Sequence, residues 1–133
     1  MQPLYQKNIL DHGLSPRNRG LLIPADVDYE ADNASCGDRL RLTLRLNPHN
    51  RITAVGWGGE GCAISQAAAS MLGEVIVGKH LDHVRQISKD DIFSMLGVPL
   101  SMSRERCALL PLKALMVALY GANEWRKYEN EED

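Results

Sequence analysis

The sequence predicts a single α+β domain in which helices pack on one face of a three-stranded antiparallel sheet. The chain has 133 residues, a common size for one compact domain. From Arg39 to Leu46 it alternates strictly between leucine and a polar or charged residue, which is typical of a strand with one buried face. From Cys62 onward, apolar residues recur at helical spacing. Strands followed by helices are the order of an α+β fold.

The first segment, residues 4–12, predicts a short amphipathic helix with Leu4 and Ile9 on one side. Glycine and proline residues then end the helical pattern. We therefore expect an irregular connection over residues 17–24.

The strands come next. In residues 39–46 the four leucines share one face, and three arginines and Thr43 share the other. Turn residues at 47–50 and an extended pattern from Ile52 to Trp57 predict a hairpin. A shorter third strand is expected at Val27–Glu30. Such a sheet needs helices on its apolar face, while the arginine face is left for solvent or a partner.

Helices follow the strands. They are expected over residues 62–77, 82–86, 88–96 and 104–120. Ser88 is placed to cap the third of these helices, and Gly97 to end it. Pro111 falls inside the last one, where proline removes a backbone hydrogen bond, so we expect a kink or a boundary there.

Composition narrows the classes of function. Hydrophobic residues make up 44% of the chain and charged residues 24%, as in ordinary globular domains. No apolar run reaches the roughly 20 residues of a membrane span, and we see no secretory signal, so we expect a cytoplasmic protein. The net charge of −2 is unlike that of a nucleic-acid-binding protein. Acidic residues gather at the end, so we expect one domain over residues 1–123 and an acidic, mobile tail over 124–133.

Three cysteines lie far apart in the sequence: Cys36, Cys62 and Cys107. An odd, sparse set does not form a disulfide scaffold, which leaves buried structural thiols or thiolates gathered into one site. Each cysteine is expected at a junction, where a strand ends or a helix starts, and glycines flank the first two. Side chains converge at such junctions, and a helix N-terminus lowers the pKa of a thiol. These surroundings favour one shared site.

Asp38 is a candidate fourth ligand. It follows Cys36 by two positions, so both side chains point to one face if the segment is extended. Three thiolates and one carboxylate suit tetrahedral zinc or the iron of an iron–sulfur cluster. The alternative is that Asp38 accepts hydrogen bonds from nearby backbone N–H groups in a turn.

The segments around the cysteines resemble known motifs. NASCGD, GEGCAISQAAAS and RERCALLP are similar to the three cysteine motifs of the IscU/SufU/NifU N-terminal family of iron–sulfur cluster assembly scaffolds. YQKNILDHGLSPRNRG resembles the N-terminal helix and HxxxPRN segment of that family. The resemblance covers residues 3–121, and three motifs in the same order are far more specific than any one of them.

The resemblance implies a compact α+β fold of the SufE/NifU/IscU type. It also implies that Cys36, Asp38, Cys62 and Cys107 hold the metal or the nascent cluster. Proteins of this kind are scaffolds, not enzymes: they accept sulfur from a cysteine desulfurase, carry a transient [2Fe–2S] cluster and pass it to recipient apo-proteins. We expect a monomer or a weak homo-oligomer with no nucleic-acid or membrane partner.

The branch of the family is left open by the sequence. GCAIS and RCALLP look like the SufU branch, and Arg106 stands where IscU-type scaffolds carry histidine. SufU-type sequences, however, often have an insertion between the second and third cysteines, and Cys62 and Cys107 are here spaced as in IscU or NifU. The chain combines features of both branches.

This combination implies an alternative function. A SufU-like protein holds Zn²⁺ and accepts persulfide sulfur, so that it activates a cysteine desulfurase as a zinc-dependent sulfurtransferase. Cys107 is the candidate sulfur acceptor. Asp38 is the candidate labile ligand, because a carboxylate holds a soft metal more weakly than a thiolate does, and the same weakness would favour cluster release from a scaffold. An inert structural zinc domain is disfavoured, since such sites use cysteine and histidine ligands.

The remaining polar candidates are weaker. We do not expect a histidine ligand among His12, His49, His80 and His83. The arginine face of the predicted strand has two interpretations, an exposed polar surface or a docking surface for an acidic partner.

Overall fold

The computed structural model describes residues 7–33 and 37–130, which form six helices and three strands within these ranges. In chain order they are α1 (Lys7–Leu14), β1 (Val27–Asn33), β2 (Asp38–Leu46), β3 (Ile52–Glu60), α2 (Ala63–Ile76), α3 (Leu81–Val84), α4 (Lys89–Leu96), α5 (Met102–Tyr120) and α6 (Ala122–Asn130). The expected α+β class is confirmed. Strands β1 and β3 are longer than the sequence predicted, and residues 4–6 of the expected first helix lie outside the described residues.

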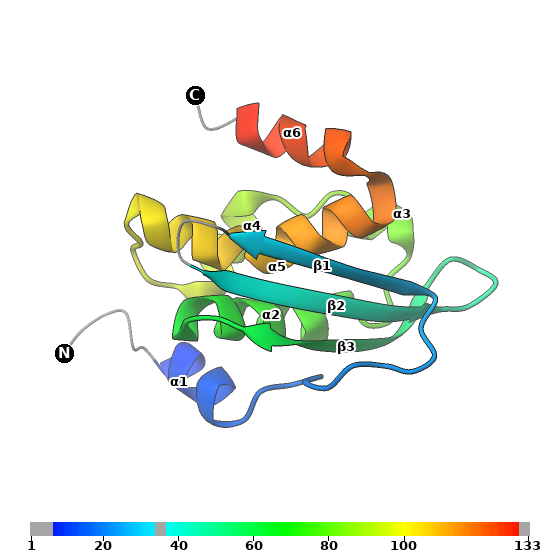
Figure 1. Cartoon of the computed structure of the whole chain (residues 1–133), viewed down its shortest axis with the longest axis horizontal. Helices are drawn as coiled ribbons and strands as arrows, with labels where there is room; N and C mark the ends of the chain where they lie inside the picture. The colour runs from blue at the N-terminus through cyan, green and yellow to red at the C-terminus, as the bar shows by residue number, and fades with distance from the viewer. Residues whose placement is uncertain (1–6, 34–36, 131–133) are drawn as a thin grey trace.

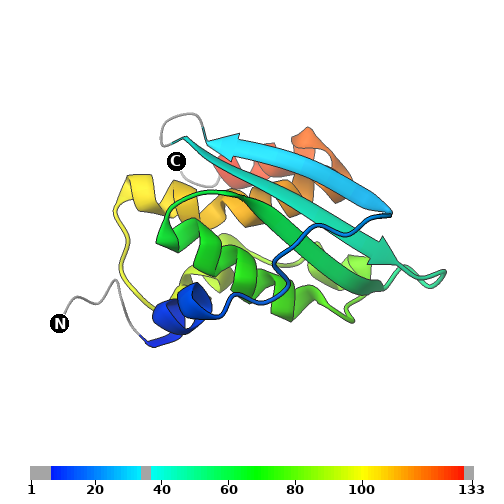
Figure 2. The ribbon, with the colours of Figure 1, turned by 60° about the horizontal axis from the view of Figure 1, so that its bottom comes forward.

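The sheet is a meander with strand order β1-β2-β3, antiparallel throughout. Its central strand carries the predicted alternation, and Leu42 pairs with Tyr29 on one side and Trp57 on the other. Helices α2 and α5 lie behind the sheet in Figure 1, and Figure 2 shows the same two layers from another side. Leu40, Leu42 and Leu44 are buried in the core between these layers.

The other face of the sheet is crossed by the chain between α1 and β1. Residues 17–24 of this segment, which we call the strap, run from the free edge of β3 toward β1 (Figure 2). Backbone N–H groups of Gly20 and Trp57 donate to carbonyls of Trp57 and Asn18, so the strap adds short backbone pairing to that edge.

The strap corrects one expectation about the sheet. Thr43, placed by alternation on the solvent face, is fully buried beneath it. Its hydroxyl donates to the Gly56 carbonyl at 2.6 Å and accepts from the backbone N–H of Leu22 at 3.0 Å. Alternation describes a single strand, and it does not reveal a distant segment that covers the face.

The helix ends follow the expected chemistry. Ser88 and Asp91 form a reciprocal capping box at the start of α4, and Gly97 ends it with a positive φ of 71°. Pro111 lies inside α5. Of the two expectations for this proline, a kink or a helix boundary, the boundary is wrong. Residues on both sides of Pro111 are buried, so packing of α5 in the core offsets the hydrogen bond that proline removes.

The C-terminal segment differs from the expected tail. Residues 122–130 are helical in α6, Trp125 is buried, and Glu124 forms an ion pair with Arg85 at 2.9 Å. Gly121, with a φ of 92°, makes the turn between α5 and α6. The acidic composition suggested a solvated end, whereas Trp125 supplies apolar surface that packs on the domain. The domain boundary at residue 123 and the mobility of the tail stay predictions.

Among the described residues, no helix has the length and apolar character required to cross a bilayer.

Candidate metal centre

Three of the four predicted ligands come together at one end of the sheet. Asp38 is the first residue of β2, Cys62 directly precedes α2, and Cys107 lies in the second turn of α5. Their ligand atoms, one carboxylate oxygen and two sulfurs, all lie within 4.8 Å of one another. Residues far apart in the sequence are thus gathered as expected, and neither of these two cysteines forms a disulfide bond with a described residue.

The cluster is set into the surface and not deep in the core. Asp38 is 6% exposed and Cys107 is 4% exposed, whereas Cys62 is partly exposed. The site is thereby shielded from solvent on two sides and accessible through Cys62. A scaffold or sulfur carrier needs such access, because its cargo must enter and leave.

The Asp38 carboxylate has one oxygen that receives no hydrogen bond from the described residues, unlike the expected turn residue. Its Oδ2 atom is buried and has no hydrogen-bond partner among the described residues. Burying an unpaired carboxylate oxygen is costly, so such an atom is found where something else satisfies it. A metal ion held jointly with Cys62 and Cys107 would satisfy it. The donor set, hard oxygen with two soft sulfurs, fits zinc or iron.

Gly61 keeps the space beside the carboxylate open. A Cβ at this position would collide with Ser65 Oγ and would lie 3.4 Å from Asp38 Oδ2. The absence of a side chain thus lets the loop before Cys62 approach the start of β2. The sequence alone indicates only that a glycine flanks Cys62.

Cys62 is the N-cap residue of α2, with φ −75° and ψ 172°, and its side chain makes no capping hydrogen bond. Its carbonyl instead accepts from the N–H of Gln66 at 3.1 Å and from the hydroxyl of Ser65 at 3.0 Å. The sulfur is therefore available for a ligand beside the N-terminus of the helix. The sequence does not point to the buried Ser65, because its role depends on a hydrogen bond to the Cys62 carbonyl.

Cys36, the remaining predicted ligand, lies outside the described residues. It belongs to the connection between β1 and β2, and Gly37 on its C-terminal side adopts a positive φ of 75°. Asn33 and Asp38 pair at the two ends of that connection. Its membership of the ligand set stays a prediction.

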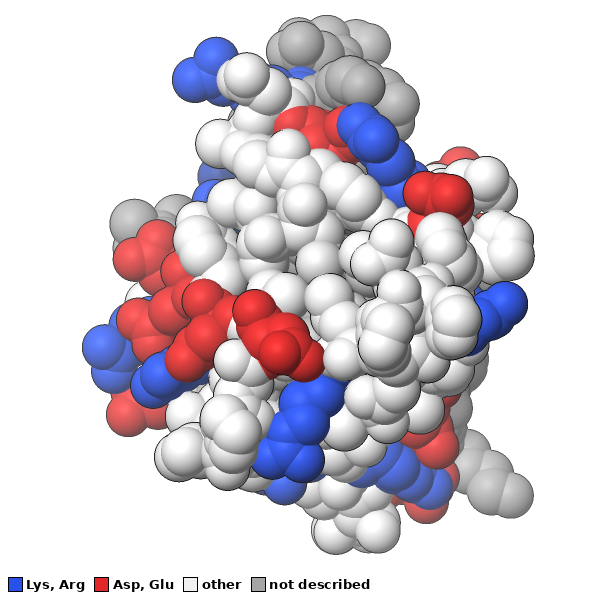
Figure 3. Space-filling view, turned by 90° about the vertical axis from the view of Figure 1, so that its right-hand side faces the viewer, with Lys and Arg blue, Asp and Glu red and all other residues white. Residues whose placement is uncertain are grey.

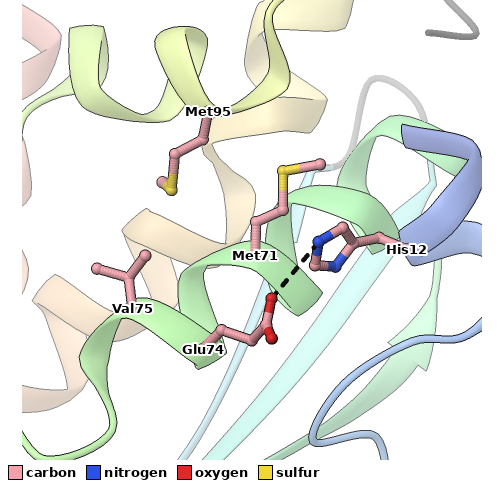
Figure 4. Close-up of a pocket in the computed structure, with 5 residues that line it drawn as sticks. All are labelled: His12, Met71, Glu74, Val75 and Met95. Atoms are coloured by element: carbon pink, nitrogen blue, oxygen red, sulfur yellow. Dashed lines mark ion pairs between the residues drawn. The ribbon is translucent and has the colours of Figure 1, made fainter. Parts of the chain in front are cut away.

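The histidines lie outside the cluster of ligand atoms. His12 lines a separate surface pocket with Met71, Glu74, Val75 and Met95 (Figure 4). Its Nδ1 lies 2.6 Å from Ser70 Oγ, and its Nε2 lies 3.5 Å from a Glu74 oxygen. Burial lowers the pKa of His12, and the Arg17 cation lowers it further, against smaller opposite effects of Glu74 and Asp11.

The arginines of β2 do not form an unpaired cationic face. Arg41 pairs with Asp28 at 2.6 Å, Arg39 lies 3.7 Å from Glu60, and Arg45 donates to a strap carbonyl. Figure 3 views the molecule from the right-hand side of Figure 1, where acidic and basic side chains lie among many uncharged ones. Arg41 and Arg39 thus face carboxylates of neighbouring strands, and Arg45 is bound to the strap, while a docking surface for an acidic partner stays a prediction.

Comparison with known proteins shows the family of the chain. Residues 4–129 match the family model described as the NifU-like N-terminal domain. The zinc-dependent sulfurtransferase SufU of Bacillus subtilis is 35% identical, with 86% of this chain and 88% of that protein covered. The scaffold protein IscU of Aquifex aeolicus is also 35% identical, with 86% of this chain and 73% of that protein covered.

Longer relatives contain the domain as one part. The bifunctional protein NifU/MnmA of Rubrobacter xylanophilus is 38% identical over 115 residues, and the match spans 24% of its length. Among solved structures, that of FiSufU from Fervidobacterium islandicum AW-1 superposes with a TM-score of 0.72 at 27% identity, covering 87% of this chain and 96% of that one.

Proposed function

The chain belongs to the NifU-like N-terminal domain family, and on this premise we propose that it is a scaffold for iron–sulfur cluster assembly. One observation carries the proposal: Asp38, Cys62 and Cys107 offer ligand atoms within 4.8 Å of one another, and the carboxylate has a buried oxygen with no partner in the part of the chain that the structure describes. We assign Cys36 as the fourth ligand. Three thiolates and one carboxylate then hold a transient [2Fe–2S] cluster as cargo.

The ligand set suits a cluster that must be released. Thiolates bind iron strongly, whereas a single carboxylate is the weaker, more exchangeable ligand. We assign this role to Asp38, which lies beside the partly exposed Cys62. An incoming ligand from a recipient apo-protein would replace the carboxylate first.

Sulfur enters by transfer from a cysteine desulfurase. We assign Cys107 as the acceptor: its thiolate attacks the outer sulfur of the donor persulfide, a new S–S bond forms on Cys107, and the donor cysteine leaves as a thiolate. The transfer is balanced without an added oxidant or reductant. Conversion of that sulfur to sulfide requires two electrons from a separate reductant.

A second candidate function is zinc-dependent sulfur transfer, favoured by the Bacillus subtilis SufU relative. Here the same four residues hold Zn²⁺, which fixes their geometry and keeps the sulfurs deprotonated. The protein then accepts persulfide sulfur and accelerates the desulfurase. In either function the partners are a cysteine desulfurase and sulfur- or cluster-accepting proteins. The reactive thiolates suit the cytoplasm, where thiols stay reduced.

Metal analysis followed by anaerobic reconstitution separates the two functions. The purified protein is assayed for zinc and iron, then incubated with ferrous iron, cysteine, a cysteine desulfurase and dithiothreitol. A scaffold develops the visible absorption of a [2Fe–2S] cluster, which Cys36→Ala, Cys62→Ala and Cys107→Ala abolish and the exposed control Ser94→Ala retains. One tight zinc per chain, no cluster and faster desulfurase turnover would assign the sulfurtransferase role. If neither result is obtained, both functions are contradicted.

A further inference from the structure

Two side chains outside the ligand set form a continuous chain of hydrogen bonds to the backbone beside Cys62. Gln66, in the first turn of α2, folds back so that its Nε2 donates to the Gly61 carbonyl at 3.1 Å. Its own backbone N–H donates to the next carbonyl, that of Cys62, also at 3.1 Å. One residue therefore holds two successive carbonyls around the Gly61–Cys62 peptide.

Arg19 of the strap fixes the orientation of this glutamine. One guanidinium nitrogen donates to Gln66 Oε1 at 3.4 Å, and the other donates to the Gly59 carbonyl at 3.4 Å. A guanidinium only donates and a backbone carbonyl only accepts, so the amide must present its oxygen to Arg19 and its nitrogen to Gly61. The two partners exclude the flipped amide.

Trp57 gives Arg19 a rigid platform. The guanidinium carbon lies 4.9 Å from the centre of the indole ring, a cation–π distance. Trp57 is itself buried in the core, and its Nε1 donates to the Arg17 carbonyl of the strap at 2.7 Å. The position of Arg19 is thus set by the sheet and by the strap together.

The backbone that these residues hold links strand β3 to Cys62. Residues 58–60 are the end of β3 and pair with residues 39–41 of β2, whereas Gly61 lies between that strand and Cys62. A glycine link samples many conformations unless other groups fix it. Because the peptide unit is planar, fixing the Gly61 carbonyl also fixes the direction of the Cys62 N–H and limits where Cys62 can place its sulfur.

We propose that Gln66, oriented by Arg19, is a positioning residue that holds the Gly61–Cys62 peptide so that Cys62 can bind metal together with Asp38 and Cys107. The inference deepens the proposed function and rests on it. The strap thereby becomes part of the support of the metal centre. Partners that orient metal ligands typically contribute about 10–100-fold to metal affinity.

Zinc affinity, measured by competition with a chromophoric chelator, tests this role on the full chain. We expect Gln66→Ala to bind zinc about 10–100-fold more weakly than the wild type. Gln66→Glu should lose a similar factor, because a carboxylate cannot donate to the Gly61 carbonyl. Arg19→Ala should weaken binding as well. Two matched controls should leave affinity unchanged: Arg45→Ala, which loses one bond to the other end of the strap, and Gln86→Glu on the exposed surface.

Two further readouts separate positioning from a general loss of structure. If Arg19 supports the metal centre through Gln66 and not through its bond to the Gly59 carbonyl, the Arg19→Ala/Gln66→Ala double variant should bind zinc no more weakly than Gln66→Ala alone. Additive losses would contradict this relay. Cobalt-substituted Gln66→Ala should show altered thiolate-to-cobalt charge-transfer bands, while its unfolding in urea without metal stays close to that of the wild type. If Gln66→Ala does not fold, the same measurements are made on Arg19→Ala, whose substitution lies in the strap.

The outcomes also separate this inference from the proposed function. Wild-type affinity and wild-type cobalt bands in Gln66→Ala, Gln66→Glu and Arg19→Ala would overturn the positioning role and leave the metal centre intact. A wild-type protein that binds neither zinc nor cobalt through its cysteines would overturn the proposed function itself, and the positioning role with it.

Discussion

Replacement of Asp38 by alanine should stabilise the metal-free protein, although it removes a predicted ligand. The wild-type side chain is 6% exposed, and its Oδ2 has no hydrogen-bond partner among the described residues. Folding without metal therefore removes water from a carboxylate oxygen, and no residue in ranges 7–33 and 37–130 replaces it with a hydrogen bond. Alanine has no such group, and the change removes little apolar contact.

The size of the effect follows from the state of that oxygen. An unsatisfied buried polar group costs about 1–3 kcal/mol, and a charged one more. We therefore expect Asp38→Ala to raise the free energy of unfolding of the metal-free protein by about 1–3 kcal/mol. Zinc at 100 times the wild-type dissociation constant stabilises the wild type by about 2.7 kcal/mol. At the same zinc concentration, a variant that binds 10–100-fold more weakly is stabilised by about 1.3–2.3 kcal/mol less. Zinc should thus reduce or cancel the advantage of the variant.

Urea denaturation, followed by circular dichroism with chelator and then with zinc, measures both free energies. Asp32→Ala is the matched control, because Asp32 is an exposed aspartate on the neighbouring strand β1. Its substitution should change stability by no more than about 0.5 kcal/mol in either condition. A metal-free Asp38→Ala protein that is less stable than the wild type would refute the reasoning, since Asp38 would then be a satisfied structural carboxylate.

Three further outcomes are expected. Asp38→Ala should release a reconstituted [2Fe–2S] cluster to an apo-ferredoxin more slowly than the wild type, because its exchangeable ligand is gone; faster loss, followed by absorbance, would count against that role. Thr43→Val should lower the free energy of unfolding by about 1–3 kcal/mol, since it leaves the Leu22 N–H and the Gly56 carbonyl without their partner, while the exposed Thr53→Val changes it little. Burial and Arg17 lower the pKa of His12, so the unfolded chain binds that proton more tightly; stability should fall as the pH drops below about 6.5, and His12→Gln should flatten this part of the profile.

The sequence predicted the elements whose signals are local. The leucine alternation of β2, the N-cap at Ser88 and the helix end at Gly97 depend on residues within one turn or one strand, and the structure confirms each. The burial of Thr43 could not be predicted in this way, because the strap that covers it comes from a different part of the chain. The same holds for Trp125, whose packing turns part of the expected tail into a helix.

The candidate site likewise contains residues that the sequence predicted and residues that it could not predict. Cysteines at element junctions predicted that Asp38, Cys62 and Cys107 converge, and their distances agree with this. Gln66 and Arg19 carry no pattern of their own in the sequence. Their proposed role depends on one side-chain amide that reaches back to a carbonyl and on a cation from the strap, and only the folded arrangement brings these groups together.

X-ray absorption at the zinc edge of the zinc-loaded protein tests most directly whether the three cysteines and Asp38 bind one ion. The account predicts three sulfur ligands at about 2.3 Å and one oxygen ligand at about 2.0–2.2 Å, with the oxygen lost in Asp38→Ala and one sulfur lost in each cysteine variant. Fewer than three sulfurs in the wild type, or a spectrum unchanged by Asp38→Ala, would contradict it.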